Sequence, residues 1–213
     1  MQLLSKLMAS ILEFFYTYLG NWGYAIIGLT LVVRLIIWPL TIKQNRSLKR
    51  MQEIQPQLKK LQEKYKNNPE KLNKEMLALY QKHGVNPMGG CLPLFLQLPI
   101  ILALFTVLRN MEYTGSPVFI RGWIDDLSVP DPYYILPILA AVTTYITQKQ
   151  MTTDPKQAQT MMFMPLLIGW FATRFPAGLA LYWVASNVFG IIQHYIAGGQ
   201  LGLKGDLAPD ENN

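Results

Sequence analysis

The stretch YAIIGLTLVVRLIIWPL, residues 24–40, decides the fold of this chain. It is long and apolar enough to cross a membrane as a helix, and one arginine, Arg34, is embedded in it. A charged side chain near the middle of a spanning helix costs about 2.5–3.5 kcal/mol on insertion scales, so it normally faces a bundle interior or a water-filled cavity. Arg34 is therefore a candidate functional residue. The alternative is an arginine that snorkels, or that pairs within the bundle and has no further role.

The composition of the whole chain supports a membrane protein. Of its 213 residues, 51% are hydrophobic and 15% are charged, which is too apolar for one soluble domain. The single cysteine, Cys91, excludes an internal disulfide, and the two histidines, His83 and His194, are too far apart in sequence to favour a metal site. Nothing resembles a phosphate loop or a catalytic constellation. We therefore expect no cofactor, no metal and no enzymatic reaction.

The segment before this stretch is predicted to lie in the membrane interface. Residues 3–19 place apolar side chains along one helix face and polar ones, among them Lys6 and Glu13, along the other. The pattern favours an amphipathic interfacial helix within residues 1–23 over a spanning helix. A signal peptide is not indicated, because a basic start, a continuous apolar centre and a small-residue cleavage site are missing.

The segment after it, residues 41–87, is strongly basic. It holds eleven Lys or Arg residues against four glutamates, so the positive-inside rule predicts a cytoplasmic location. Apolar residues recur at helical spacing on both sides of the break at residues 66–69, which predicts two antiparallel helices packed as a hairpin. Pro56 either kinks the first helix or marks a restart. The basic face is either a solvated surface or a docking surface for anionic headgroups or RNA-containing partners.

Four further apolar segments follow within residues 88–197, at 92–108, 134–147, 160–175 and 179–197. The predicted fold class is an all-α integral membrane protein with five transmembrane helices, an N-terminal interfacial helix and a cytoplasmic helical hairpin. The N-terminus is expected outside and the C-terminus in the cytoplasm, with residues 198–213 as a disordered tail. The first four spans reach only about 21–26 Å, against a hydrocarbon thickness of about 30 Å, so the bilayer thins or the helix ends lengthen.

Several segments together resemble a known family. They are GNWGY at 20–24, LTLVVRLIIWPLT at 29–41, NPMGGCLPLFLQLPI at 86–100, GWIDDLSVPDPYYILPIL at 122–139 and FPAGLALYWVASNVFGIIQ at 175–193. Over roughly residues 10–197 the chain is similar to the YidC/Oxa/Alb insertase family, most closely its bacterial YidC branch. The resemblance implies a five-span core with a hydrophilic groove, open to the cytoplasm and to lipid but closed outside. It also implies insertion and folding of membrane proteins, alone or beside the Sec translocon.

The resemblance also implies the residues of the groove. Thr30 and Arg34 are four residues apart and share a helix face, which agrees independently with a polar stripe. Trp183 stands where a tyrosine is expected, and Ile101 where some members have phenylalanine. The expected substrate groove comprises Arg34, Thr30 and Gln97, with Phe171, Phe175, Trp183 and Ser186 as further substrate contacts.

The implied partners are nascent membrane proteins and the lipid bilayer of the bacterial inner membrane, with the ribosome and the Sec translocon as further candidates and no small-molecule substrate. Relatives carry an additional N-terminal span and periplasmic domain, or a lipoprotein signal; the chain is expected to be a trimmed core or a minimal member. Two other classes remain open. A small transporter would use Arg34 to bind an anionic solute, and a scaffold would recruit partners through the hairpin.

Overall fold

The computed structural model describes residues 2–84, 92–110, 116–151 and 163–196. The described residues form helices and connecting loops, with one isolated bridge between Ile120 and Ile124 and no longer strand pairing. The all-α fold class is therefore confirmed. The helices are α1 (Gln2–Leu19), α2 (Trp22–Lys64), α3 (Pro69–Lys82), α4 (Leu92–Asn110), α5 (Ile135–Met151), α7 (Phe163–Ala172) and α8 (Ala177–Ile196).

The break between α1 and α2 has a local cause. Gly20 adopts a φ of 63°, in the left-handed region that a glycine occupies at little cost, and so ends α1. Asn21 then caps α2, because its side-chain oxygen accepts hydrogen bonds from the backbone N–H groups of Gly23 and Tyr24. Across the turn, the rings of Tyr16 and Trp22 stack with centroids 4.0 Å apart. The two helices therefore fold back on each other.

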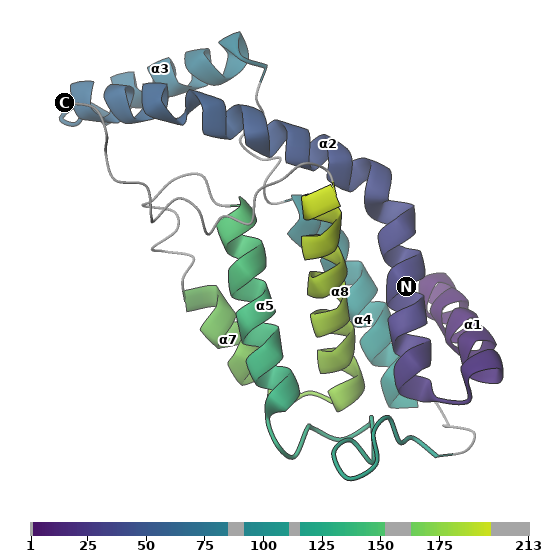
Figure 1. Cartoon of the computed structure of the whole chain (residues 1–213). Helices are drawn as coiled ribbons and strands as arrows, with labels where there is room; N and C mark the ends of the chain where they lie inside the picture. Colours follow the sequence, from purple (N-terminus) through teal and green to yellow (C-terminus); the bar gives the residue numbers. More distant parts are fainter. Residues whose placement is uncertain (1, 85–91, 111–115, 152–162, 197–213) are drawn as a thin grey trace.

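The long helix α2 runs without interruption from the bundle into the basic segment. It contains Pro39 and Pro56, each of which removes one backbone hydrogen-bond donor. Helix α2 nevertheless continues through both, so the idea that Pro56 marks a restart is wrong. Figure 1 shows α2 curving between the bundle and its far end, and prolines are common sites of such bends.

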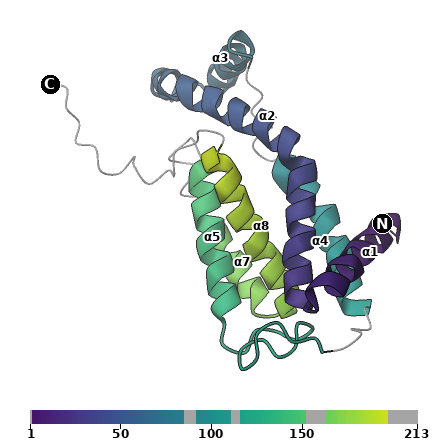
Figure 2. The ribbon, with the colours of Figure 1, turned by 45° about the vertical axis from the view of Figure 1, so that its right-hand side comes forward.

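The second half of α2 packs against α3. Ile54 and Leu58 of α2 are buried against Met76, Leu79 and Tyr80 of α3. In both ribbon views these two segments project beyond one end of the bundle (Figures 1 and 2). We call them the hairpin.

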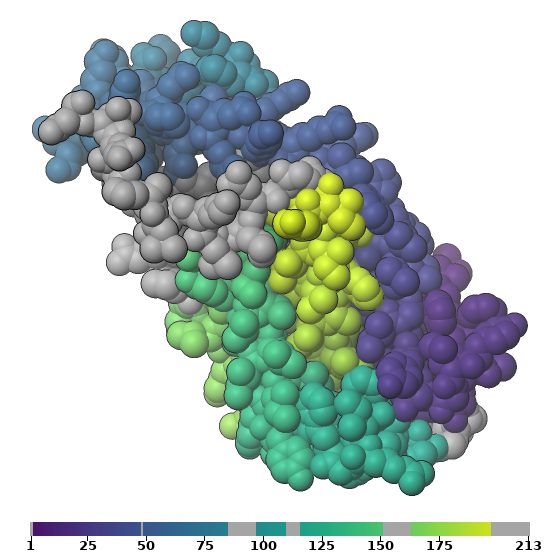
Figure 3. Space-filling view, in the orientation of Figure 1, coloured from purple at the N-terminus to yellow at the C-terminus, as the bar shows by residue number. Residues whose placement is uncertain are grey.

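The remaining helices form one bundle around α8. In the space-filling view α8 is visible between α5 and the first half of α2, and α4 and α7 lie behind in the ribbon view (Figures 1 and 3). The starts of α2, α5 and α8 lie together at the end of the bundle opposite the hairpin (Figure 1). The core is a single cluster to which every bundle helix contributes, including Met8, Leu29, Leu104, Leu136 and Tyr182.

The helix lengths bear on the expected fit to a bilayer. Helix α5 has 17 residues and extends beyond the predicted segment 134–147, while α4 has 19 and α8 has 20. At about 1.5 Å per residue, the 17 residues of α5 reach about 26 Å. Among the described residues, α2 is the one helix that length and composition alone mark as able to span a membrane. Residues 160–162, 197 and the tail 198–213 lie outside the described residues.

Polar and apolar side chains are distributed as in a membrane protein. Large apolar side chains are exposed on the outside of the bundle, among them Ile36 at 71% and Leu166 at 69%. Polar side chains are buried inside, including Thr30, Thr144 and Ser186. A water-soluble bundle has the opposite arrangement. This distribution agrees with a lipid environment.

Candidate functional site

Arg34 lies on the face of α2 that is turned toward α8. Its Nε donates a hydrogen bond to the Ser186 hydroxyl, 3.1 Å away, across 152 positions in sequence. The guanidinium rests against Gly190, where an added Cβ would lie only 3.0 Å from one terminal nitrogen. The side chain is half-buried. In the described part of the chain, no hydrogen bond or ion pair engages its two terminal nitrogens.

Helix α4 contributes Gln97 to the same region. The Gln97 side-chain amide donates to the hydroxyl of Tyr182, at 2.9 Å. Tyr182 is fully buried and lies one helical turn before Ser186 on α8. Thr30 lies one turn before Arg34 on α2, also fully buried, and donates its hydroxyl hydrogen to the Ile26 carbonyl at 2.6 Å. These polar side chains come from three helices, and we call them the Arg34 cluster: Thr30, Arg34, Gln97, Tyr182 and Ser186.

One face of α8 forms the floor of this cluster. Tyr182, Ser186, Gly190 and Gln193 follow one another at intervals of four, four and three residues, which is helical spacing. Gln193 donates from its amide nitrogen to the Arg34 carbonyl at 3.2 Å, while its buried side-chain oxygen has no hydrogen-bond partner among the described residues. Sequence reasoning missed Tyr182, Gly190 and Gln193. The signal was available, because each lies at helical spacing from Ser186.

Trp183 belongs to a different set of contacts. Its indole N–H donates to the Thr144 hydroxyl at 2.9 Å. The Asn187 amide donates to Thr143 at 3.1 Å and to Thr144 at 3.0 Å. We call these four residues of α5 and α8 the threonine cluster. Trp183 thus contacts α5. The tyrosine that bonds to Gln97 is Tyr182, the residue before Trp183 in the sequence.

The two phenylalanines predicted as substrate contacts, Phe171 and Phe175, pack near each other and beside α4. Phe171, on α7, is 41% exposed, and its ring centroid is 6.2 Å from that of Phe175. The Phe175 ring packs edge-on against Phe105 of α4, with centroids 5.9 Å apart. These rings form an apolar row between α7 and α4 with no described contact to Arg34.

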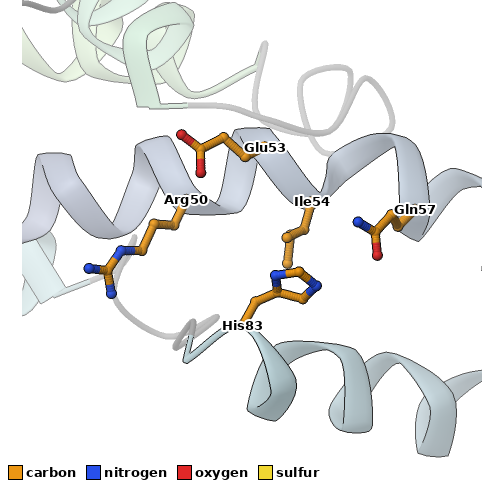
Figure 4. A pocket seen from close by; sticks show the side chains of 5 residues that line it. All are labelled: Arg50, Glu53, Ile54, Gln57 and His83. Atoms are coloured by element: carbon orange, nitrogen blue, oxygen red, sulfur yellow. The ribbon is translucent and has the colours of Figure 1, made fainter.

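A surface hollow of about 410 Å³ lies far from Arg34, within the hairpin. Figure 4 shows the Ile54 side chain directed toward the His83 ring, with Arg50, Glu53 and Gln57 around them. Its lining mixes acidic, basic and apolar groups and does not converge on one chemistry. In the described parts of the chain, no group of three or more His, Cys, Asp or Glu residues could hold a metal.

The family follows from comparison with known proteins. The profile of the family described as 60Kd inner membrane protein matches residues 14–201. The chain belongs to this family. A "Membrane protein insertase YidC" of Cupriavidus taiwanensis is 45% identical over 209 residues, covering 97% of this chain and 37% of the relative. One of Wolinella succinogenes is 47% identical over 205 residues, covering 94% of this chain and 38% of the relative.

A solved structure also matches the chain. The crystal structure of an active YidC insertase with its first transmembrane domain resolved matches with a TM-score of 0.71 and 30% identity. The match covers 90% of this chain and 45% of that one. The resemblance to the bacterial YidC branch is therefore confirmed. The chain spans just over a third of the length of the curated relatives it matches.

Proposed function

We propose that the chain acts as a membrane protein insertase and chaperone, which inserts membrane proteins and helps them fold, alone or with the Sec translocon. The observation that carries the proposal is the Arg34 cluster. Here a cation whose terminal nitrogens have no partner among the described residues is surrounded by polar side chains of three helices, inside a bundle with an apolar exterior. Relatives named as YidC insertases, about 45% identical over nearly the whole chain, support it.

Arg34, Thr30, Gln97 and Ser186 are proposed to line a hydrophilic groove within the membrane. A hydrophilic tail of the substrate enters from the cytoplasm, and its acidic residues are attracted to the terminal nitrogens of Arg34. The attraction is stronger than in bulk water, because the effective dielectric constant inside the protein is lower. The contact of the guanidinium with Gly190 supports this role of Arg34. A glycine offers no side chain to bond, and the terminal nitrogens have no other partner among the described residues.

The apolar segment of the substrate is proposed to leave along α2, α4 and α8 into lipid. Its burial drives the step at about 25 cal/mol per Å². Phe171 and Phe175 offer apolar contact beside α4, and exposure of the Phe171 ring supports that role. Trp183 is proposed as a contact of the last span. No cofactor, metal or covalent step enters this mechanism.

The proposed topology has five spans in the bacterial inner membrane, with residues 1–23 at the outer interface and 24–40 as the first span. Residues 41–87 form the cytoplasmic hairpin, 88–197 hold spans two to five, and 198–213 form the cytoplasmic tail. The basic surface of the hairpin is proposed to dock anionic headgroups or the ribosome. The excess of Lys and Arg in residues 41–87 supports both the cytoplasmic location of the hairpin and its docking to an anionic partner.

Reconstitution of the purified protein into liposomes tests the proposal. A single-span substrate with a short acidic tail should acquire a protease-protected tail only in liposomes that contain the protein. Anion flux without insertion would overturn the proposal in favour of a transporter. Equal activity of an Arg34→Ala variant would favour a scaffold.

Crosslinking to a stalled nascent chain locates the path. A photocrosslinker at Ile101, half-buried one turn after Gln97, should capture the substrate. One at Leu102, the neighbouring residue that is 54% exposed, serves as the matched control and should capture mainly lipid. Equal capture of the substrate at both positions would argue against a groove on the Arg34 side of α4.

A further inference from the structure

The loop of residues 116–134 crosses the end of the bundle opposite the hairpin (Figure 1), and we call it the end loop. It is folded onto the bundle. Ile124 and Leu127 are 1% and 0% exposed and belong to the main core. The Phe119 ring lies against the backbone of Gly23, so close that a Cβ at residue 23 would overlap it.

The end loop is bonded to the starts of two helices. The Val129 carbonyl accepts from the N–H of Ala177 at 2.7 Å, and the Leu127 carbonyl accepts from the N–H of Gly178 at 2.9 Å. These are the first two residues of α8, whose N–H groups lack partners within the helix. Asn21, the N-cap of α2, donates from its amide to the Phe119 carbonyl at 3.1 Å.

Asp131 joins the end loop to a third helix. Its side chain is 2% exposed, and one oxygen accepts hydrogen bonds from the Trp123 indole at 2.9 Å and the Tyr133 N–H at 3.0 Å. The other oxygen accepts from the Leu136 N–H at 2.7 Å, in the first turn of α5. A carboxylate is favoured at a helix N-terminus by the helix dipole. One buried side chain thus fastens the loop to α5.

The three fastened helices carry all members of the two polar clusters except Gln97, which lies on α4. Arg34 lies on α2, the threonine pair on α5, and Ser186 and Asn187 on α8. A hydrated groove among these helices that was open at both ends would leak ions across the membrane. The family resemblance already implies a groove that is closed at its outer end. We propose that Asp131 is the positioning residue that holds the end loop in place and so keeps the groove closed there. The inference uses the proposed function only for the hydrated groove.

The test is an ion leak, measured without any substrate. Liposomes that contain the Asp131→Asn variant should leak protons and a trapped small anion at least severalfold faster than wild type. Asparagine keeps one oxygen acceptor but turns an amide toward donors that need an acceptor. The matched control is Asp126→Asn, which removes the same charge. Among the described residues, the Asp126 side chain bonds only to Ser128, within the loop. This control variant should be as tight as wild type.

A second variant keeps the test decisive. Trp123→Phe keeps an aromatic ring at this position but removes the indole donor to Asp131 together with part of the ring volume. It should leak as well, and it provides the test if Asp131→Asn does not fold. Thermal unfolding in detergent identifies folded protein. Two folded variants as tight as wild type, or a lowered melting temperature without a leak, would overturn the proposal. Leaky variants beside a tight wild type support the seal even if the wild type inserts no substrate.

Discussion

The two faces of α8 carry similar polar side chains but use them differently. On one face, Ser186 meets Arg34 of α2 and Tyr182 meets Gln97 of α4. On the other, Asn187 meets the hydroxyls of the threonine cluster on α5. Both sets lie inside the same bundle, and composition alone does not separate them.

The two sets differ in whether their hydrogen-bond donors have partners among the described residues. In the threonine cluster, the Asn187 amide and the Trp183 indole both bond to Thr144, and the Thr143 hydroxyl bonds to the Leu139 carbonyl. Both threonines are 8% exposed. The Arg34 cluster leaves two charged nitrogens without a described partner. A polar cluster whose donors are used holds helices together, and one with donors to spare can receive a substrate.

The largest expected effect comes from Arg34. An Arg34→Ala variant should insert a substrate with an acidic tail about 10- to 100-fold more slowly. A hydrogen bond to a charged group is worth about 1.5–3 kcal/mol, and each 1.4 kcal/mol is a factor of ten. Protease protection of the tail in proteoliposomes measures the rate.

A series of tails isolates the charge. Arg34→Lys keeps the charge and should retain activity, and a substrate with a neutral tail should respond little to either variant. Equal insertion of acidic tails by both variants would show that the charge of Arg34 is not required. The residue would then act only by keeping water inside the membrane.

The threonine cluster should respond in stability. Asn187→Leu keeps the volume but removes both bonds to Thr143 and Thr144. Interhelical hydrogen bonds in membranes average about 0.6 kcal/mol and reach about 1.7, so the free energy of unfolding should fall by about 1–2 kcal/mol. Unfolding in mixed detergent measures it.

The control for this variant lies on the adjacent, exposed position. Val188→Leu changes a lipid-facing side chain that is 39% exposed and should leave the stability within about 0.5 kcal/mol. An Asn187→Leu protein as stable as wild type, with slower insertion, would reverse the two roles and make the threonine cluster a substrate site.

Much of this site could be predicted from the sequence. An arginine in an apolar segment predicts a functional residue, and the family resemblance predicted Thr30, Gln97 and Ser186 as its neighbours. Arg34 and Ser186 are 152 residues apart, so their hydrogen bond could not follow from local spacing. The choice between Tyr182 and Trp183 depended on the rotation of α8. Adjacent residues point about 100° apart on a helix, and only Tyr182 shares the face of Ser186.

The course of α2 was harder to predict. Proline weakens a helix by removing a donor and clashing with the preceding turn, which suggested an interruption at Pro56. Here α2 continues, with Ile54 and Leu58 on either side of Pro56 packed against α3. Tertiary packing outweighed the local preference. The role of Asp131 was also beyond the sequence, because its partners join a loop to a helix start.

A smaller effect is expected from the hydroxyl of Tyr182. Tyr182→Phe removes the acceptor of the Gln97 amide and should slow insertion about two- to fivefold, since one neutral hydrogen bond is worth about 0.5–1.5 kcal/mol. The loss should be the same for acidic and neutral tails. Tyr195→Phe, on the same helix and 66% exposed, is the matched control. A loss confined to acidic tails would instead mean that Tyr182 acts through Arg34.

The smallest effect is expected at Gly190, against which the Arg34 guanidinium packs. A Cβ at residue 190 would lie 3.0–3.2 Å from three guanidinium atoms of Arg34. A flexible side-chain end can yield by a few tenths of an ångström, so Gly190→Ala should slow insertion of acidic tails only about twofold. The exchange also favours the helix by about 0.5–1 kcal/mol, so the variant should be at least as stable as wild type.

Gly169→Ala separates this positional effect from crowding in general. There a Cβ would lie equally close, 3.0 Å, to the Ala141 Cβ, and 3.4 Å from the Pro137 carbonyl of α5, where no flexible side chain can yield. This variant should therefore lose stability, and its insertion should not depend on the charge of the tail. If Gly190→Ala behaved in the same way, the glycine would serve helix packing alone, and the orientation of the Arg34 charge would not limit insertion.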